Sequence, residues 1–366
     1  MKRRLLILML LVCTTLLAAQ GVRDGAQPPS THAAIDANGR TLMLDGPVGD
    51  LLIAGKAGNM PANALFLFPE VERIHLTLPK TDQGLGDFFA LLRSELDQQS
   101  RLSQTASVEE IAARGPDLVL MKATHFESTA KKLDQLGVKN FTMSLETWNE
   151  WQREIVQLGA LLGNPGRAHE ILGLYRARLD LIESRAAQIK SQDQQRVLLL
   201  QADRTDNTTS YKIAPDSWIQ TWMVEVSGAS AVWKGANKAA AGWSTVSFEQ
   251  IAAWDPDLIV LISYSTPTAS YLDGVYSSPL WANLRAVKEG AVVASPHDLM
   301  NYIQPVASWI LGLQWLAKTT YPERYRDIDM RTEIERFYRD FYAITDRSII
   351  QTLVDAYSRS IADNRR

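Results

Sequence analysis

The sequence predicts an α/β fold of two Rossmann-like lobes with mostly parallel sheets, joined by one long α-helix. Three observations support this prediction: one segment occurs twice, apolar strand-like runs alternate with helical patterns, and a long amphipathic helix separates the two halves. Of the 366 residues, 46% are apolar and 22% charged, a balance that suits two ordinary α/β cores and excludes a disordered chain.

The repeated segment reads SVEEIAARGPDLVLM from Ser107 and SFEQIAAWDPDLIVLI from Ser247. The copies start 140 residues apart, far more than the period of about 20 to 50 residues found in solenoids. This spacing matches one whole α/β domain. The repeat therefore predicts two related lobes.

Each copy has the pattern of a short helix followed by a buried strand. Ser107 and Ser247 are expected to cap the helices, and Glu110 and Gln250 to complete capping boxes. A proline then ends each helix, and the unbroken apolar run after it is typical of a strand covered on both faces. These two strands are expected at 118–121 and 258–262.

The other elements follow the same alternation. Further strands are expected at 51–54, 140–143, 197–201 and 291–294, and helices at 86–96, 128–136, 147–162, 332–342 and 346–359. Between the lobes, Asn164 and Pro165 open an apolar repeat of three-to-four spacing that predicts a stiff linking helix over 164–190, roughly 38 Å long. A stiff connector implies modest closure of the lobes.

The first 21 residues have the pattern of a secretory signal. Three basic residues, Lys2 to Arg4, precede an apolar stretch that ends at the small-residue site Ala19-Gln20-Gly21. The stretch is shorter than the roughly 20 residues of a membrane anchor. Cleavage would also remove Cys13, the only cysteine, which excludes disulfides, thiolate metal sites and a cysteine nucleophile. Lipid attachment at Cys13 would require a small residue next to the cysteine, and Leu10-Leu11-Val12 does not provide one.

The chain thus divides into a signal peptide at 1–21, a disordered leader at 22–34, an N-terminal lobe at 35–163, the linking helix at 164–190, a C-terminal lobe at 191–320 and C-terminal helices at 321–366. The formal net charge of −3 gives no reason to expect a nucleic-acid partner.

Five segments carry a resemblance to a known family: DANGRTLMLDGPVGDLLIAG at 36–55, SVEEIAARGPDLVL at 107–120, KKLDQLGVKNFTM at 131–143, WMVEVSGASAVW at 222–233 and GWSTVSFEQIAAWDPDLIVL at 242–261. In this order they resemble the iron-complex, siderophore and cobalamin type of periplasmic substrate-binding proteins of ABC importers, the class with a helical backbone between lobes. The resemblance covers residues 35–344.

The resemblance implies a monomeric periplasmic protein that delivers an iron chelate to an ABC permease dimer and meets the membrane only through that permease. It implies no catalytic residue and no cofactor. In this family one acidic residue per lobe docks onto permease arginines, and Glu109 and Glu249 match that position. An alternative role for both is to stabilise a helix N-terminus.

Ligands of open α/β sheets bind beyond the carboxyl ends of the strands. The segments just after the predicted strands contain tyrosine and tryptophan, which suit a bulky chelate, and lysine, which suits an anionic one. The candidate ligand-binding residues are Lys56, Asn59, Met60, Lys122, His125, Tyr211, Trp243, Ser263, Tyr264, His297 and Tyr302.

Two alternatives remain open. A bare metal ion would need three or four converging ligands, for which His125 and His297 with Asp298 or Glu127 are the candidates, although the five histidines are not clustered. Haem and cobalamin would fit the same fold.

A secreted α/β enzyme is the second alternative. The sequence has no GxSxG or HExxH motif and no phosphate loop. Gly84-Leu85-Gly86 is the nearest glycine pattern, and it lacks the third glycine of a phosphate-binding motif.

Overall fold

The computed structural model describes residues 32–80, 83–97, 101–206, 208–237 and 242–364. The predicted signal peptide and most of the predicted leader lie outside these residues. The end of the leader was predicted wrongly, because His32 to Ala34 belong to strand β1 (His32–Ile35), which pairs antiparallel with β2 (Thr41–Leu44). The Ile35 N–H donates to Gln157 Oε1 at 2.6 Å, so this hairpin is tied to α5 (Trp148–Leu161).

The N-terminal lobe is built on a four-stranded parallel sheet with the order β4-β3-β5-β6. Its strands are β3 (Asp50–Ala54), β4 (His75–Thr77), β5 (Leu118–Lys122) and β6 (Asn140–Met143). Apart from α5, its helices are α1 (Asn59–Leu65), α2 (Phe88–Leu92), α3 (Val108–Ala112) and α4 (Lys131–Gln135), with 3-10 turns at Pro69–Arg73, Ser94–Leu96 and Ala123–His125. Every residue of β5 is buried, as its apolar run predicts.

Two predicted helices of this lobe are shorter than expected. The helix expected at 86–96 is interrupted because Arg93 is extended and its guanidinium donates to the carbonyls of Val71 and Ile74. The helix expected at 128–136 keeps α-helical geometry only in α4, because the preceding turn, Phe126–Ala130, is π-helical.

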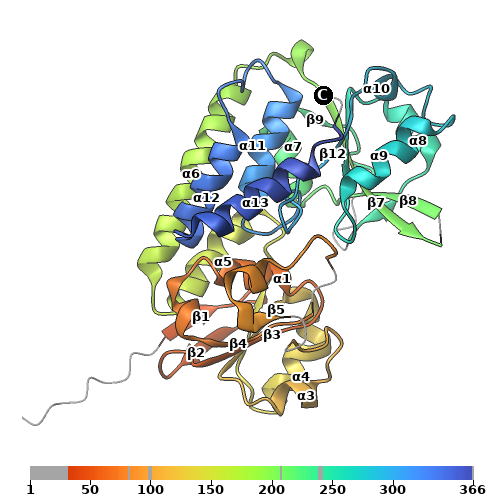
Figure 1. Cartoon of the computed structure of the whole chain (residues 1–366). Coiled ribbons are helices and arrows are strands. Elements are labelled where there is room, and N and C mark those ends of the chain that lie inside the picture. Colours follow the sequence, from red (N-terminus) through yellow and green to blue (C-terminus); the bar gives the residue numbers. More distant parts are fainter. Residues whose placement is uncertain (1–31, 81–82, 98–100, 207, 238–241, 365–366) are drawn as a thin grey trace, which may run out of the picture. The chain divides into compact units, whose positions relative to one another are not determined.

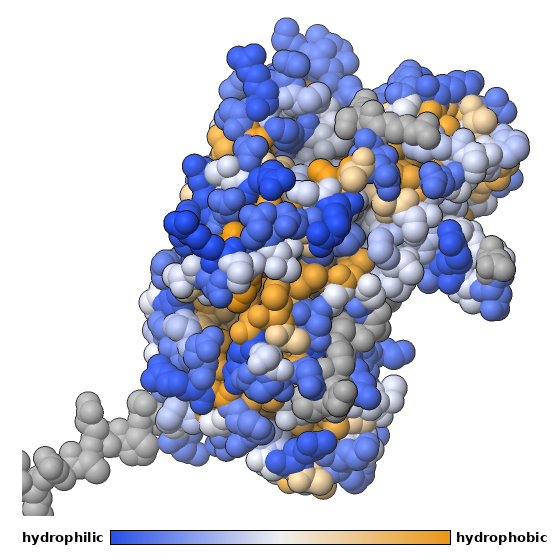
Figure 2. Space-filling view, viewed as in Figure 1, coloured by the Kyte–Doolittle hydropathy of each residue, from blue (hydrophilic) through white to orange (hydrophobic). Residues whose placement is uncertain are grey.

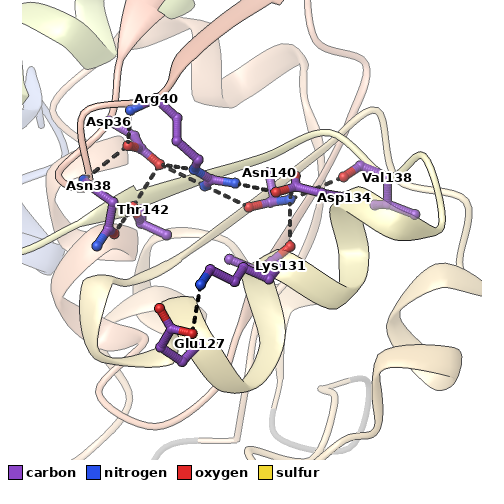
Figure 3. A network of polar contacts seen from close by, with 10 residues as sticks. Asp36, Asn38, Arg40, Glu127, Lys131, Asp134, Val138, Asn140 and Thr142 are labelled. Atoms are coloured by element: carbon purple, nitrogen blue, oxygen red, sulfur yellow. Dashed lines mark hydrogen bonds and ion pairs between the residues drawn. The ribbon is translucent and has the colours of Figure 1, made fainter.

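The segment DANGR forms the turn between β1 and β2 and ties it to the sheet (Figure 3). The buried Asp36 carboxylate accepts hydrogen bonds from Arg40 and, at 2.8 Å, from Thr142 Oγ1 on β6. Arg40 also pairs with Asp134 at 2.7 Å, and Asn140 bonds to both Arg40 and Asp134. The DANGR segment of the family resemblance therefore has a structural role, which is to hold the β1–β2 turn against the sheet.

The C-terminal lobe contains a mixed sheet with the order β10-β8-β7-β11-β12, and β9 pairs with β7. Its strands are β7 (Arg196–Thr205), β8 (Thr208–Ile213), β9 (Ser230–Ala231), β10 (Ser244–Thr245), β11 (Leu258–Ile262) and β12 (Val292–Ala294). Its helices are α7 (Ile219–Val226), α8 (Phe248–Trp254), α9 (Leu272–Ser277) and α10 (Arg285–Lys288), with 3-10 turns at Ser191–Asp193 and Thr268–Tyr271. Among these described strands only β8 runs against the others, since it pairs antiparallel with both β7 and β10.

The two lobes share one strand pattern, since β9-β7-β11-β12 in the second lobe repeats β4-β3-β5-β6 in the first. The repeated Pro-Asp-Leu sequence has the same structural role in both. Asp117 Oδ2 accepts from the N–H groups of Gly49 and Asp50 at 2.8 Å, and Asp257 Oδ2 accepts from the N–H of Arg196 at 2.7 Å. Each aspartate therefore anchors the start of the neighbouring strand.

The linking helix is α6 (Pro165–Ala186), which lies beside α11 (Trp309–Thr320) and α12 (Met330–Tyr342). Helix α13 (Arg347–Ser360) contacts α12 and crosses these helices at an angle in the view of Figure 1. At 1.5 Å per residue α6 is roughly 33 Å long and ends four residues before the predicted Lys190. It ends where Ala186 and Ile189 pack against Gly228, at a position where an added Cβ would clash.

Apolar surface on one face gathers in a band between α13 and the N-terminal lobe, while polar side chains cover most of the rest (Figure 2). None of the helices in the described part of the chain combines the length and the apolar character needed to cross a bilayer.

Candidate ligand-binding cleft

A cleft of about 480 Å³ is lined by residues of both lobes. One wall follows the carboxyl ends of β3 and β5, and the other includes the middle of β7 and the segment after β11. Ligands of open α/β sheets bind at this edge. The described lining consists of Lys56, Ala57, Asn59, Met60, Gln83, Lys122, Thr124, Glu146, Gln201, Ala202, Asp203, Trp218, Gln220, Trp243, Tyr264, Ser265, Gln304 and Pro305.

The structure brings together part of the predicted site. Predicted residues that line the cleft are Lys56, Asn59, Met60, Lys122, Trp243 and Tyr264. His125 lies next to this lining, because its Nε2 is 3.1 Å from the carbonyl oxygen of Lys56.

The remaining predicted residues lie outside the lining, because each is engaged in contacts with other parts of the chain. Tyr211 packs against Trp281 with ring centroids 5.0 Å apart. Ser263 is buried, and its carbonyl accepts from Asn301 at 3.0 Å. None of the four residues Tyr211, Ser263, His297 and Tyr302 belongs to the described lining of the cleft.

His297 and Tyr302 are buried beneath the C-terminal helices. The Tyr302 hydroxyl donates to Asp298 Oδ2 at 3.0 Å, and Tyr338 of α12 donates to the same oxygen. The His297 N–H donates to Ser360 Oγ of α13, and burial lowers the pKa of the His297 imidazole. The loop after β12 therefore anchors the C-terminal helices.

Lys122 and Glu146 form an ion pair in the cleft. Lys122 ends β5, and its side chain is only 3% exposed. Its Nζ donates to Glu146 Oε1 at 2.7 Å and to the carbonyl of Ser144. Oε2 of Glu146 is buried without a hydrogen-bond partner. The pair thus leaves one carboxylate oxygen available.

A strained turn holds Glu146 in this position. Leu145 is fully buried with φ +58°, a backbone conformation that is unusual for a residue other than glycine. Glu154 stabilises the turn, because its Oε2 accepts from the N–H groups of Ser144 at 2.8 Å and Leu145 at 3.0 Å. Burial raises the pKa of Glu154 to about 7, although Arg153 opposes the shift. The Glu146 carbonyl accepts from the N–H of Ile219, which starts α7 of the other lobe.

Three aromatic rings form one wall of the cleft. The ring centroids of Trp218 and Trp243 are 6.1 Å apart, and those of Trp243 and Tyr264 are also 6.1 Å apart. The Tyr264 hydroxyl donates to the carbonyl of Ile303 at 2.9 Å, and burial raises the pKa of Tyr264 well above its usual value. This wall therefore offers apolar ring surface and a neutral phenol.

The cleft combines one exposed lysine with unpaired polar atoms. Lys122 and Glu146 pair with each other, and Asp203 pairs with Lys212 at 3.1 Å. Lys56 is exposed at the edge of the cleft. Buried atoms without a hydrogen-bond partner in the lining are Asn59 Nδ2, Glu146 Oε2, Gln201 Oε1 and Gln220 Oε1. Buried polar atoms are normally paired, so water or a bound ligand supplies the partners of these atoms.

Several lining residues were missed from the sequence, among them Glu146, Gln201, Trp218 and Gln220. Trp218 follows no predicted strand, and Glu146 stands three residues after the strand predicted at 140–143. Gln220 carried a usable signal, since it is a polar residue within the apolar segment Trp218 to Val224. A buried glutamine in such a setting needs partners.

Gly84-Leu85-Gly86 forms a contact between the lobes. A Cβ on Gly84 would lie 2.2 Å from the Ser265 carbonyl oxygen, and one on Gly86 would lie 2.6 Å from Leu299 Cδ2. Gln83 donates to Gln304 Oε1 at 2.8 Å beside this contact. The glycines therefore permit close packing of the two lobes.

The described residues contain no group of three or more His, Cys, Asp or Glu side chains placed to hold a metal ion. His125, His297, Asp298 and Glu127, considered as metal ligands above, form no such group. Asp298 is already occupied by two tyrosine hydroxyls.

Glu109 and Glu249 are exposed at the second positions of α3 and α8. In α3, Ser107 and Glu110 form the predicted capping box. The box predicted for α8 is wrong, because the structure has only the bond from the N–H of Gln250 to Ser247 Oγ. The backbone amide of Glu249 and the Ser247 side chain lower the pKa of Glu249, so this glutamate interacts with the start of its helix.

A model of the family described as periplasmic binding protein matches residues 93–299. The molybdate-binding protein MolA of Haemophilus influenzae is 24% identical over 283 residues, which are 70% of this chain and 76% of that protein. The Fe(3+)-citrate-binding protein YfmC of Bacillus subtilis is 23% identical over 216 residues, which are 59% of this chain and 64% of that protein.

Solved structures share the fold. The structure of MolA bound to molybdate has a TM-score of 0.70 at 18% identity and covers 86% of this chain and 99% of its own. A periplasmic solute-binding protein from Veillonella parvula has a TM-score of 0.69 at 20% identity and covers 91% of this chain and 100% of its own.

Proposed function

Because the chain belongs to the family of periplasmic binding proteins and is an ABC transporter substrate-binding protein, we propose that it binds an iron chelate in the cleft between its lobes. Its relatives are solute-binding transport proteins, and the chain is not an enzyme. The observation that carries the proposal is the lining itself, which combines three aromatic rings with the exposed Lys56, while Lys122 and the two acidic residues of the lining are held in ion pairs.

The size of the cleft favours a chelate over a small oxyanion. One water occupies about 30 Å³ of liquid, so a cleft of about 480 Å³ has room for a ligand of many heavy atoms. Pockets for organic ligands typically measure about 300 to 1,000 Å³. MolA binds molybdate and YfmC binds ferric citrate, and of these two ligands the larger organic complex suits this cleft better.

The charges and rings suit an anionic chelate with organic ligands around the metal. Lys56 is exposed at the edge of the cleft, where it can approach a carboxylate or catecholate oxygen. Trp218, Trp243 and Tyr264 offer rigid apolar surface for the organic part of the complex. We propose Lys56, Asn59, Met60, Lys122, Trp243 and Tyr264, together with Glu146, Gln201, Trp218 and Gln220, as the ligand-binding residues.

Docking to the permease is proposed for Glu109 and Glu249. Both are exposed at the same position of the repeated helix, one in each lobe. A carboxylate in each lobe could pair with arginines of the two permease subunits. With this role, the protein would act as a monomer in the periplasm after removal of residues 1–21.

Tryptophan fluorescence tests the proposal, because Trp218 and Trp243 line the cleft. The purified protein is titrated with ferric citrate, ferric hydroxamates, ferric catecholates, haem, cobalamin, molybdate and free divalent metal ions. We expect saturable quenching by a ferric chelate at micromolar concentration or below. Saturation by molybdate or a bare metal ion alone would overturn the iron-chelate proposal, and saturation by haem or cobalamin alone would assign that ligand instead.

A further inference from the structure

We propose that the cleft selects a chelate whose outer surface carries hydrogen-bond donors, N–H or O–H, which bind Glu146, Gln201 and Gln220. This inference rests on the proposed function and names a narrower class of ligand. It follows from which polar atoms of the cleft are already paired and which are not.

Glu146 provides the first unpaired acceptor. Lys122 occupies Oε1, while Oε2 is buried without a partner. A carboxylate has only acceptor sites, so this oxygen needs a donor. The geometry is imposed by the turn at Leu145, which Glu154 holds through two backbone N–H groups. Glu146 therefore presents an acceptor that the protein leaves unmatched.

Gln220 provides the second unpaired acceptor. The residue is 1% exposed, and its amide oxygen is buried without a hydrogen-bond partner. Its amide group lies near Tyr264, whose hydroxyl gives its own proton to the Ile303 carbonyl at 2.9 Å. The Tyr264 hydroxyl proton is therefore not available to the amide oxygen of Gln220.

Gln201 provides the third acceptor, because its buried Oε1 also lacks a partner. It lies on β7, in register with Ile262 of β11 and Lys212 of β8. The three acceptors thus come from the N-terminal lobe at Glu146 and from two elements of the C-terminal lobe. A ligand that donates to all three would bridge the lobes.

Donors also line the cleft, at Lys56 and at the unpaired Asn59 Nδ2. The complementary ligand therefore has an anionic or carbonyl region facing these groups and N–H or O–H groups facing Glu146, Gln201 and Gln220. A fully deprotonated oxyanion such as molybdate offers only acceptors, and it would leave the three oxygens unmatched.

Two ferric complexes that differ only in donors provide the test. Ferric tris-acetohydroxamate keeps three N–H groups, whereas ferric tris-(N-methylacetohydroxamate) has a methyl group in place of each hydrogen and the same charge. Both are titrated calorimetrically into the intact protein, with ferric citrate as a further chelate. We expect the N–H complex to bind at least about tenfold more tightly, the effect of one or more hydrogen bonds to a buried acceptor.

The variant Q220L removes one acceptor with little change in volume. It should reduce affinity for the N–H complex by a larger factor than affinity for the N-methyl complex, with thermal unfolding as the check on folding. Equal affinity of the native protein for the two hydroxamate complexes, or preference for the N-methyl complex, would overturn the inference and leave the proposed function intact. If no ferric complex binds, the proposed function fails and the inference fails with it.

Discussion

The Lys122 ammonium lies 2.7 Å from Glu146 Oε1, and the two side chains are 3% and 20% exposed. This pair joins the end of β5 to the strained turn that follows β6. The Glu146 carbonyl in this turn also accepts a hydrogen bond from the N–H of Ile219 at the start of α7. The pair therefore connects the N-terminal sheet, the cleft and the opposite lobe.

The substitution K122M should leave the Glu146 carboxylate buried and without its partner. Removing one member of a mostly buried ion pair is expected to cost on the order of 3 kcal/mol in the free energy of unfolding. Urea unfolding of K122M measures this cost. The double variant K122M/E146Q should recover most of the stability, because no unpaired charge remains, but it should still bind ferric chelates weakly. Stability of K122M equal to that of the native protein would contradict the assigned ion pair.

Charge reversal at the two proposed docking glutamates should separate transport from binding. In E109K/E249K we expect uptake of the radiolabelled ferric chelate to fall at least about tenfold, because lysines would face permease arginines. Affinity measured on the purified variant should not change. E335K, which reverses an exposed glutamate on α12, is the matched control and should transport normally. Undiminished uptake by the double variant would exclude this docking role.

Glu154 should make stability depend on pH near neutrality. Its pKa rises from an ordinary 4.5 to about 7 in the folded protein because the carboxyl group is buried. Between these values the folded protein holds a proton that the unfolded chain lacks. The free energy of unfolding should therefore rise as pH falls from about 7 to 4.5, by up to about 1.4 kcal/mol per pH unit.

The variant E154Q has no group to titrate at this position and should lose that part of the pH dependence. Urea unfolding of both proteins at a series of pH values measures the difference. Parallel profiles over this range would show that Glu154 does not titrate with a raised pKa.

The repeated aspartates should each stabilise the start of one strand. D117A removes an acceptor shared by two backbone N–H groups at an exposed site, for which we expect a loss of about 1 kcal/mol. D257A should cost about 2 kcal/mol, because it also removes the partner of Arg285 at 2.5 Å. D117N, which keeps an acceptor oxygen, should lose less than D117A. Equal stability of the alanine variants and the native protein would refute the anchoring role.

The architecture could be predicted because local signals agree with it. The repeat at Ser107 and Ser247 marks equivalent helix and strand pairs, and the strands predicted at 140–143 and 258–262 have the observed bounds. The two helices that were predicted too long depend on long-range contacts. Arg93, for example, bonds to carbonyls near Val71, and no pattern within its own segment encodes those bonds.

The site was harder to predict, because position after a strand does not determine exposure. Lys122 ends β5 and Tyr264 follows β11, and both line the cleft, whereas Tyr302 follows β12 but is buried and stacks on Tyr357 of α13. Glu146 lines the cleft directly after Leu145, which adopts a positive φ. The local sequence does not predict a positive φ for a leucine.

The measurement that tests the central claim most directly is the affinity of the double variant K56A/W243A for the ferric chelate that binds the native protein. Both residues line the cleft, whereas Trp254 of α8 lies outside its described lining and makes W254A the control. Calorimetric titration should give a dissociation constant at least about tenfold weaker for the double variant, with W254A close to the native value and all three proteins folded. Native affinity in K56A/W243A would show that the chelate binds elsewhere and would contradict the assignment of this cleft.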